Sequence, residues 1–247
     1  MSVPMNKTPS LLLLLAAAAC GDDKGSARPD ARVIPDAAPT SDTPGQPYRH
    51  VIAIDGNDDF ASGDTFPTTS ASFLARVSWD DVNLYVGYSG PDLAVTTSDA
   101  NKKWLFVYLD TTASGETQSE QYNTQRATFP SGFAADYYLR YKVDGTFSTL
   151  EHATGSGTWT TASPAPTTAQ TGMFVEMSIP LSAIGAGTQL ELVSFMINEK
   201  NLAEGTYAGL YATNFTDGYS ANMQLTEYLH ADFTSSRVPN DDANRRP

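Results

Sequence analysis

The acidic stretch at residues 55–59, Asp-Gly-Asn-Asp-Asp, carries side chains that could hold a hard cation, because calcium prefers carboxylate and carbonyl oxygens. An EF-hand loop is excluded, since Phe60 stands where that loop needs glycine and Phe66 where it needs a bidentate acid. A calcium site would therefore need carbonyl groups from a distant loop, and the alternative is that these acids form Asx turns. The candidate calcium ligands are Asp55, Asp58, Asp59 and Asp110.

A second set of side chains could recognise a sugar, whose C–H faces stack on exposed aromatic rings. Trp104 begins a long apolar run and could stand at its rim, and Trp159 lies in a polar stretch. Strand alternation places Tyr138 on the same face as Arg140, which we expect to face solvent. The alternatives are core packing for the tryptophans and a cross-strand aromatic pair for Tyr138. The predicted ligand-binding residues are Trp104, Trp159, Tyr138 and Arg140.

Motifs typical of catalysis are missing from the sequence. The three histidines are scattered, and no His-Glu-x-x-His helix, Gly-x-Ser-x-Gly elbow or phosphate-binding loop is present. Glycoside hydrolysis needs two carboxylates at a fixed separation, which cannot be read from a chain with 28 acids. Glu176 has no identifiable catalytic partner in the sequence. We therefore predict a protein that is not an enzyme.

Cys20, the single cysteine, follows the apolar run at residues 11–19. A helix of that length rises about 14 Å, well short of the roughly 30 Å needed to span a bilayer. Small residues lead directly into the cysteine, although Ala17 stands where leucine is usual. The run resembles the signal peptide and lipobox of bacterial lipoproteins, which implies cleavage after residue 19 and lipidation of Cys20. The alternative is an ordinary signal peptide.

The remaining composition indicates an exported domain on a tether. Residues 20–47 are rich in Pro, Ala, Asp, Ser and Gly and show no apolar periodicity, which predicts a disordered linker. The net charge of −13 disfavours nucleic acid and anionic lipid headgroups as partners. We therefore expect contact with the membrane through the lipid anchor alone, at the outer membrane or the periplasmic face of the cell envelope.

Residues 48–235 show the period-two alternation of β-strands separated by Gly, Pro, Asn and Asp turns. The run at 104–110 is almost wholly apolar, as expected for a central strand covered on both faces. Asp144-Gly145 predicts a hairpin turn, and residues 180–185 predict one short helical turn after Pro180 that ends at Gly185. Residues 162–172 are expected to form a loop or hairpin tip, and residues 236–247 a disordered tail. The pattern predicts an all-β fold: a single antiparallel β-sandwich of jelly-roll type. Strands are expected within 50–56, 70–79, 82–90, 104–110, 135–145, 145–153, 173–180, 189–199 and 205–213.

Several phrases, taken in order, resemble the family 9-like, or DOMON-like, carbohydrate-binding modules. They are IDGNDDF at 54–60, ARVSWDDVNLYVGY at 75–88, WLFVYLDT at 104–111, and FVEMSIPLSAIG at 174–185 leading into LELVSFMINE at 190–199. The resemblance implies a β-sandwich, a structural role for Glu176, and sugar binding through tryptophans. Because such domains also bind haem or serve as accessory modules, the fold does not select the function.

We therefore expect a lipid-anchored surface protein that binds carbohydrate or another polymer of the cell envelope without catalysis. Two alternatives remain open from the sequence. One is a structural or assembly component that docks onto another envelope protein, with all of its aromatic residues in the core. The other is a glycan-active enzyme with an unfamiliar site, which would need two acids about 5 to 9.5 Å apart in a cleft.

Overall fold

The computed structural model describes residues 45–199 and 205–247. The predicted signal peptide, Cys20 and nearly all of the predicted tether lie outside the described residues. Within these ranges the chain forms antiparallel sheets and short 3-10 helices, which confirms the predicted all-β class and is consistent with a sandwich. No helix in residues 45–199 or 205–247 is long and apolar enough to cross a membrane.

The first sheet has five antiparallel strands in the order β1-β2-β3-β10-β9. Its neighbours β2 and β3 are consecutive in the chain, whereas β10 comes from much later and pairs with β3 along its whole length. The strands are β1 (Thr65–Pro67), β2 (Leu74–Trp79), β3 (Asn83–Ser89), β9 (Thr167–Thr171) and β10 (Phe174–Pro180).

The second sheet has eight strands in the order β15-β14-β11-β4-β6-β7-β8, with β12 also paired to β11. A separate two-stranded parallel pair, β5 and β13, joins two loops. The strands are β4 (Lys103–Asp110), β5 (Ala127–Thr128), β6 (Tyr137–Lys142), β7 (Ser148–Gly155), β8 (Thr158–Ala162), β11 (Gln189–Asn198), β12 (Thr206–Tyr207), β13 (Met223–Gln224), β14 (Tyr228–Asp232) and β15 (Arg245–Arg246). The 3-10 helices are η2 (Ser62–Asp64), η3 (Pro91–Leu93), η4 (Ala100–Lys102), η5 (Leu181–Ala183) and η6 (Asp242–Asn244).

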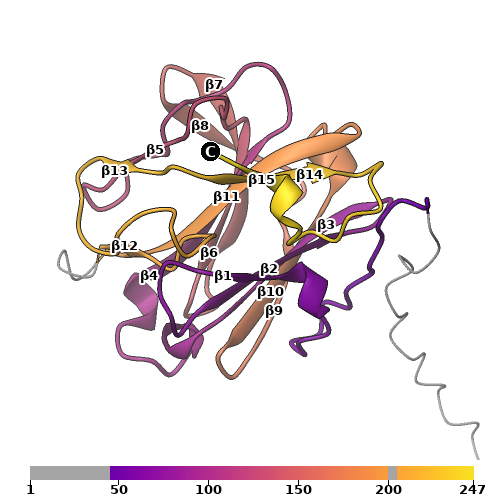
Figure 1. The fold of residues 1–247 in the computed structure, drawn as a ribbon. Coiled ribbons are helices and arrows are strands. Elements are labelled where there is room, and N and C mark those ends of the chain that lie inside the picture. The colour runs from indigo at the N-terminus through magenta and orange to yellow at the C-terminus, as the bar shows by residue number, and fades with distance from the viewer. Residues whose placement is uncertain (1–44, 200–204) are drawn as a thin grey trace, which may run out of the picture. The chain divides into compact units, whose positions relative to one another are not determined.

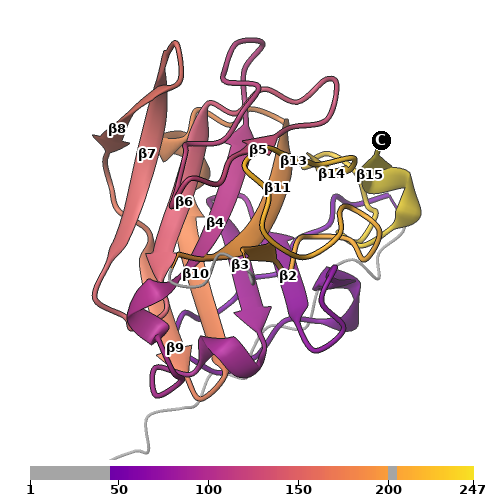
Figure 2. The same cartoon turned by 90° about the vertical axis from the view of Figure 1, so that its left-hand side faces the viewer.

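The main core lies between the two sheets. The first sheet contributes Val77 of β2, Val86 of β3 and Val175 of β10 to one buried cluster. Alternate residues of β4, including Leu105 and Leu109, belong to the same cluster. Figure 2 shows β2, β3 and β10 running next to β4 and β6. Because alternate side chains of a strand point to opposite faces, the other half of β4 must pack elsewhere.

Two local predictions are confirmed by the backbone. Strands β6 and β7 pair as an antiparallel hairpin, and Gly145 in its turn adopts a φ of 74°, a conformation that glycine reaches without steric cost. The short turn after Pro180 is η5, and it is followed by Gly185 with a φ of 63°.

Three local predictions are wrong. Residues 50–56 form no strand, because their backbone makes only isolated hydrogen bonds such as that from His50 N to Trp79 O, 2.9 Å. Residues 162–172 are not a simple loop, since they include β9 and the end of β8. The tail after residue 235 is not frayed within the described structure. It forms η6 and β15, and β15 pairs with β14 (Figure 1).

Candidate functional site

The outward side chains of β4 belong to a second apolar cluster, which we call the outer aromatic cluster. Trp104, Phe106 and Tyr108 alternate with the inward residues of β4 and meet Tyr138 of β6 and Phe195 of β11. The parallel pair of β5 and β13 and the loops on either side of it cover this face. They contribute Tyr122, Ala127, Phe129, Phe133, Ala135, Phe215, Met223 and Leu225. All eight residues of β4 are therefore buried, as the apolar run predicts.

The outer aromatic cluster removes two predicted sugar-binding rings from the surface. Trp104 is 7% exposed and Tyr138 is 1% exposed, and the Tyr138 hydroxyl donates a hydrogen bond to Glu120. The expectation that Tyr138 faces solvent is wrong, because the segment between β4 and β6 covers its face of the sheet. Its position opposite Tyr108 across β4 and β6 is the cross-strand aromatic pair named as the alternative.

The other two predicted binding residues also pack against this cluster. Trp159 is partly buried, with its ring 4.9 Å from that of Tyr138 and 5.9 Å from that of Tyr108. The Arg140 guanidinium lies 3.4 Å from Glu120 and 3.8 Å from Glu151. It also lies within 6.0 Å of the ring centres of Trp104, Tyr122, Tyr138 and Phe147. The structure thus brings all four predicted residues together. They mainly pack against one another and against the outer aromatic cluster, rather than facing a ligand at the surface.

The predicted calcium ligands in the acidic stretch at 55–59 already make contacts within the protein. Asp58 forms an ion pair with Arg76 at 2.5 Å. Asp55 accepts a hydrogen bond from Asn57 N at 2.8 Å, which is the Asx turn named as the alternative. Asp59 accepts a hydrogen bond from Ala53 N at 2.9 Å.

The four predicted calcium ligands do not converge on one point. Asp110 lies in the other sheet, where it accepts a hydrogen bond from Ala134 N at 2.7 Å. Among the residues that the structure describes, no group of three or more acidic, histidine or cysteine side chains could hold a metal ion. Calcium binding stays a prediction.

Glu176 of β10 fixes the turn at Asp55 and Gly56 to the first sheet. Its Oε1 atom accepts hydrogen bonds from Asp55 N at 2.7 Å and from Gly56 N at 2.5 Å, and the side chain is fully buried. Gly56 has a φ of 90°, and a Cβ atom there would collide with Thr171 of β9. Burial, reinforced by Asp59 and Asp55, raises the pKa of Glu176 to about 7. These contacts suit a structural role for Glu176, as the resemblance implies.

A buried polar network at the start of the domain has no clear signature in the sequence. Asp64 of η2 is fully buried, and it accepts hydrogen bonds from the Tyr48 hydroxyl at 2.5 Å and from Ala61 N at 2.9 Å. The oxygen that accepts from Ala61 also lies 2.6 Å from Nδ1 of His50. Because buried carboxylates need such partners, this network fixes the first residues of the domain onto η2. The one signal in the sequence is the presence of polar residues in an otherwise alternating stretch.

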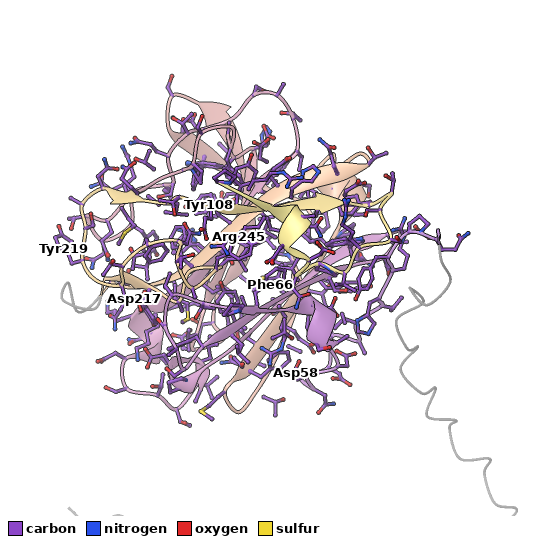
Figure 3. The ribbon with its side chains drawn as sticks, in the orientation of Figure 1. Asp58, Phe66, Tyr108, Asp217, Tyr219 and Arg245 are labelled. Carbon is purple, nitrogen blue, oxygen red and sulfur yellow. The ribbon has the colours of Figure 1, made fainter. Side chains whose placement is uncertain are left out.

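One surface hollow contains an exposed aromatic ring. It has a volume of about 720 Å³, and Tyr219 on its wall is 44% exposed. Of the Phe, Tyr and Trp side chains in the described residues, Tyr219 and Phe147 are the exposed ones. Figure 3 places Tyr219 and Asp217 close together at the rim of the molecule, away from Tyr108. The remaining lining is Ala212, Thr213, Asn214, Phe215, Thr216, Gly218, Ser220, Met223, Gln224 and Thr226.

Hydrogen bonds hold the wall of this hollow, which we call the Tyr219 hollow. The Asp217 carboxylate accepts hydrogen bonds from the hydroxyl groups of Thr69 and Ser70, both at 2.5 Å. Asn214 donates to Leu210 O at 2.8 Å and accepts from Thr226 N at 2.9 Å. A site built this way is largely formed before a ligand arrives, which lowers the entropy cost of binding. The sequence offers no signal for Tyr219, since a lone tyrosine in a loop has no periodic context.

A second hollow, of about 640 Å³, lies beside β6 and β7. Tyr137 and His152 face each other across these strands with ring centres 4.7 Å apart, and Glu116 and Asp136 also line the hollow. Both Asp136 oxygens already accept hydrogen bonds from Thr111 or Thr112. Tyr137 is only partly exposed and packs against the main core. Less of its ring is therefore available to a ligand than of the ring of Tyr219.

Two comparisons with known proteins give no match for this chain. No protein-family model matches it, and no curated protein matches it. The function is therefore inferred from the geometry of the described residues.

The side chains of the Tyr219 hollow suit binding more than proton transfer. The ring of Tyr219 offers a flat apolar face, while amide, hydroxyl and carboxylate groups offer hydrogen bonds around it. Its one carboxylate is that of Asp217, and each of the two carboxylate oxygens already accepts a hydrogen bond from one hydroxyl group. An aromatic face with directional polar groups around it is the arrangement by which proteins hold sugar rings and other amphipathic ligands.

Proposed function

We propose that this protein is an exported lipoprotein that binds a glycan or another polymer of the cell envelope without changing it chemically. Its contact with the membrane would be the lipid on Cys20, and we expect no nucleic acid partner, because the net charge of −13 disfavours one. The resemblance to family 9-like carbohydrate-binding modules and the antiparallel sheets both support this proposal. The binding site would be the Tyr219 hollow.

The exposure of Tyr219 carries the proposal. Tyr108 and Tyr138 are about 1% exposed, and Trp79 is fully buried, whereas 44% of the Tyr219 side chain is open to solvent. Exposing a large ring in this way gives up the stabilisation that burial would provide. A protein that buries most of its aromatic rings but leaves this one at the wall of a preformed hollow has a surface suited to stacking on a ligand.

Calorimetric titration with soluble oligosaccharides and cell-wall glycans tests the proposal. We expect at least one saturable binder in the panel. Replacing Tyr219 with alanine should weaken that binding roughly tenfold or more, since a central aromatic contact is commonly worth about 1–2 kcal/mol or more. Phe147→Ala is the matched control, because Phe147 is 38% exposed but does not line the hollow. The absence of heat with every glycan, or an equal loss in both variants, would contradict the proposal.

The anchor is tested separately by mass spectrometry of the protein purified from membranes. We expect a mature chain that begins at Cys20 and carries a diacylglycerol, because stable anchoring takes two or more acyl chains. Cys20→Ser should release the protein into the soluble fraction. An unmodified thiol on a freely secreted chain would show that residues 1–19 are an ordinary signal peptide.

The assembly alternative is favoured by a different observation, which is the burial of Trp104 and Tyr138 in the outer aromatic cluster. An assembly protein would need no exposed aromatic platform and would dock onto another envelope protein. Such docking would be independent of Tyr219. A single stoichiometric envelope partner, bound equally by the native chain and by Tyr219→Ala in the absence of any glycan binding, would favour this alternative over the glycan proposal.

A further inference from the structure

Strand β8 is an edge strand of the eight-stranded sheet. It pairs with β7 on one side, and in the described part of the chain no backbone hydrogen bond reaches its other side. Figure 2 shows β8 at the margin of the sheet, beyond β7. An edge of this kind presents unpaired N–H and C=O groups, which can pair with another extended chain.

The edge lacks the features by which soluble proteins commonly protect such strands. Natural edges carry charged side chains, especially lysine, or proline within the strand. The sequence of β8 is Thr-Trp-Thr-Thr-Ala, with neither, and the bulge between Ala153 and Gly155 lies on its neighbour β7. Thr158, Thr160 and Thr161 are all exposed, and threonine is a residue that favours strand pairing.

The surroundings of β8 in the sequence are also free of charge. Residues 153–175, which include β8 and β9, contain no Asp, Glu, Lys, Arg or His, although the whole chain has 28 acids and 15 bases. Depletion of charged residues is the composition found at the centre of protein interfaces. Two copies of a chain with a net charge of −13 would repel each other at most faces, but not along this edge.

We propose that β8 is a dimerisation edge, at which two copies of this chain pair their β8 strands in antiparallel fashion about a two-fold axis. A second copy fits because the edge is neutral and threonine-rich, so that it is complementary to itself across an isologous contact. The eight-stranded sheets of the two copies would become one continuous sheet. Thr160 is the central residue of β8, so full overlap of the two strands places Thr160 opposite Thr160 of the second copy.

Pairing at β8 leaves the Tyr219 hollow available, since no residue of β8 lines it. A dimer would then carry two such hollows and two lipid anchors. If the proposed function holds, a polymer that reaches both hollows would bind with greater avidity than it binds to one. The dimer itself does not depend on glycan binding, so the two proposals can fail independently.

Analytical ultracentrifugation of the full chain over a range of concentrations tests the dimer. We expect the native chain to form dimers and Thr160→Lys to be a monomer, because like charges directly opposite each other across strands repel. Thr96→Lys is the matched control, since it makes the same change at an exposed residue outside β8 and should leave the dimer intact. A native chain that stays monomeric throughout, or a Thr160→Lys variant that still dimerises, would overturn the proposal.

A mixing experiment separates this contact from misfolding of the variant. Thr160→Glu should also be a monomer, but an equal mixture of Thr160→Lys and Thr160→Glu should form dimers, because opposite charges then face each other. Recovery of a mixed dimer supports the two-fold pairing at Thr160. If both variants are folded by circular dichroism and their mixture remains monomeric, the pairing at Thr160 is wrong.

Discussion

Replacing Trp79 with alanine is expected to lower the free energy of unfolding by about 3–5 kcal/mol. Trp79 is fully buried, and its ring lies edge-on to Tyr48 at 5.7 Å and to Phe233 at 5.5 Å. It therefore joins the first residues of the domain to the segment after β14, which no strand pairing connects directly. Removing the indole would leave a cavity between segments that are far apart in the sequence. We expect the surrounding side chains to fill that cavity only partly, and an unfilled cavity adds to the loss of stability.

Urea denaturation followed by far-UV circular dichroism measures this loss. Trp79→Phe keeps an aromatic ring in the same place and should lower the free energy of unfolding much less than Trp79→Ala does. Val82→Ala should be close to neutral, because the Val82 side chain is 61% exposed. If alanine at position 79 cost no more than alanine at Val82, Trp79 would not hold the two segments together.

Glu176 is expected to make the protein less stable as the pH rises from 4.5 to above 7. Burial holds the pKa of Glu176 at about 7 in the folded state, against 4.5 for an ordinary glutamate. Over this interval the folded state keeps a proton that the unfolded state has lost, so unfolding releases a proton. The stabilisation is complete below pH 4.5 and is lost as the pH rises through 7, by an amount on the order of 3 kcal/mol.

Glu176→Gln tests this prediction because glutamine keeps a carbonyl oxygen for Asp55 N and Gly56 N but carries no ionisable group. Its stability should therefore fall less than that of the native chain over the same pH range. Asp110 should also make the protein less stable as the pH rises, since burial raises its pKa to about 6 from 3.8. This contribution should remain in the Glu176→Gln variant. Parallel stability curves for the native chain and Glu176→Gln would show that Glu176 is not the titrating group.

The sequence predicts strands well where alternation or a wholly apolar run is strong. The apolar run at 104–110 predicts a strand covered on both faces, and β4 is such a strand. Leu84 and Val86 are buried in the main core, as the alternation at 82–90 indicates. Strand β9 escapes prediction because its sequence, Thr-Thr-Ala-Gln-Thr, follows a proline-rich turn and has no apolar face of its own.

The candidate site could not be predicted from local pattern, because coverage of a sheet is a long-range property. Tyr138 and Arg140 share a face with Lys142, and polar neighbours of this kind usually mark a solvent-facing side. The segment at 111–136 instead folds over that face and buries the ring of Tyr138. Tyr219, conversely, lies in a loop that has no alternation of apolar and polar residues. Only the folded structure shows that its ring is exposed to solvent.

Nuclear magnetic resonance of the chain with labelled tyrosine rings, titrated with the glycan found by calorimetry, is the most direct test of binding at the Tyr219 hollow. The ring signal of Tyr219, assigned from its absence in Tyr219→Phe, should shift in proportion to saturation. The signals of Tyr108 and Tyr138 should stay in place, because both rings are buried in the outer aromatic cluster. A saturating glycan that leaves the Tyr219 signal unmoved and shifts that of Tyr137, in the second hollow, would contradict the account.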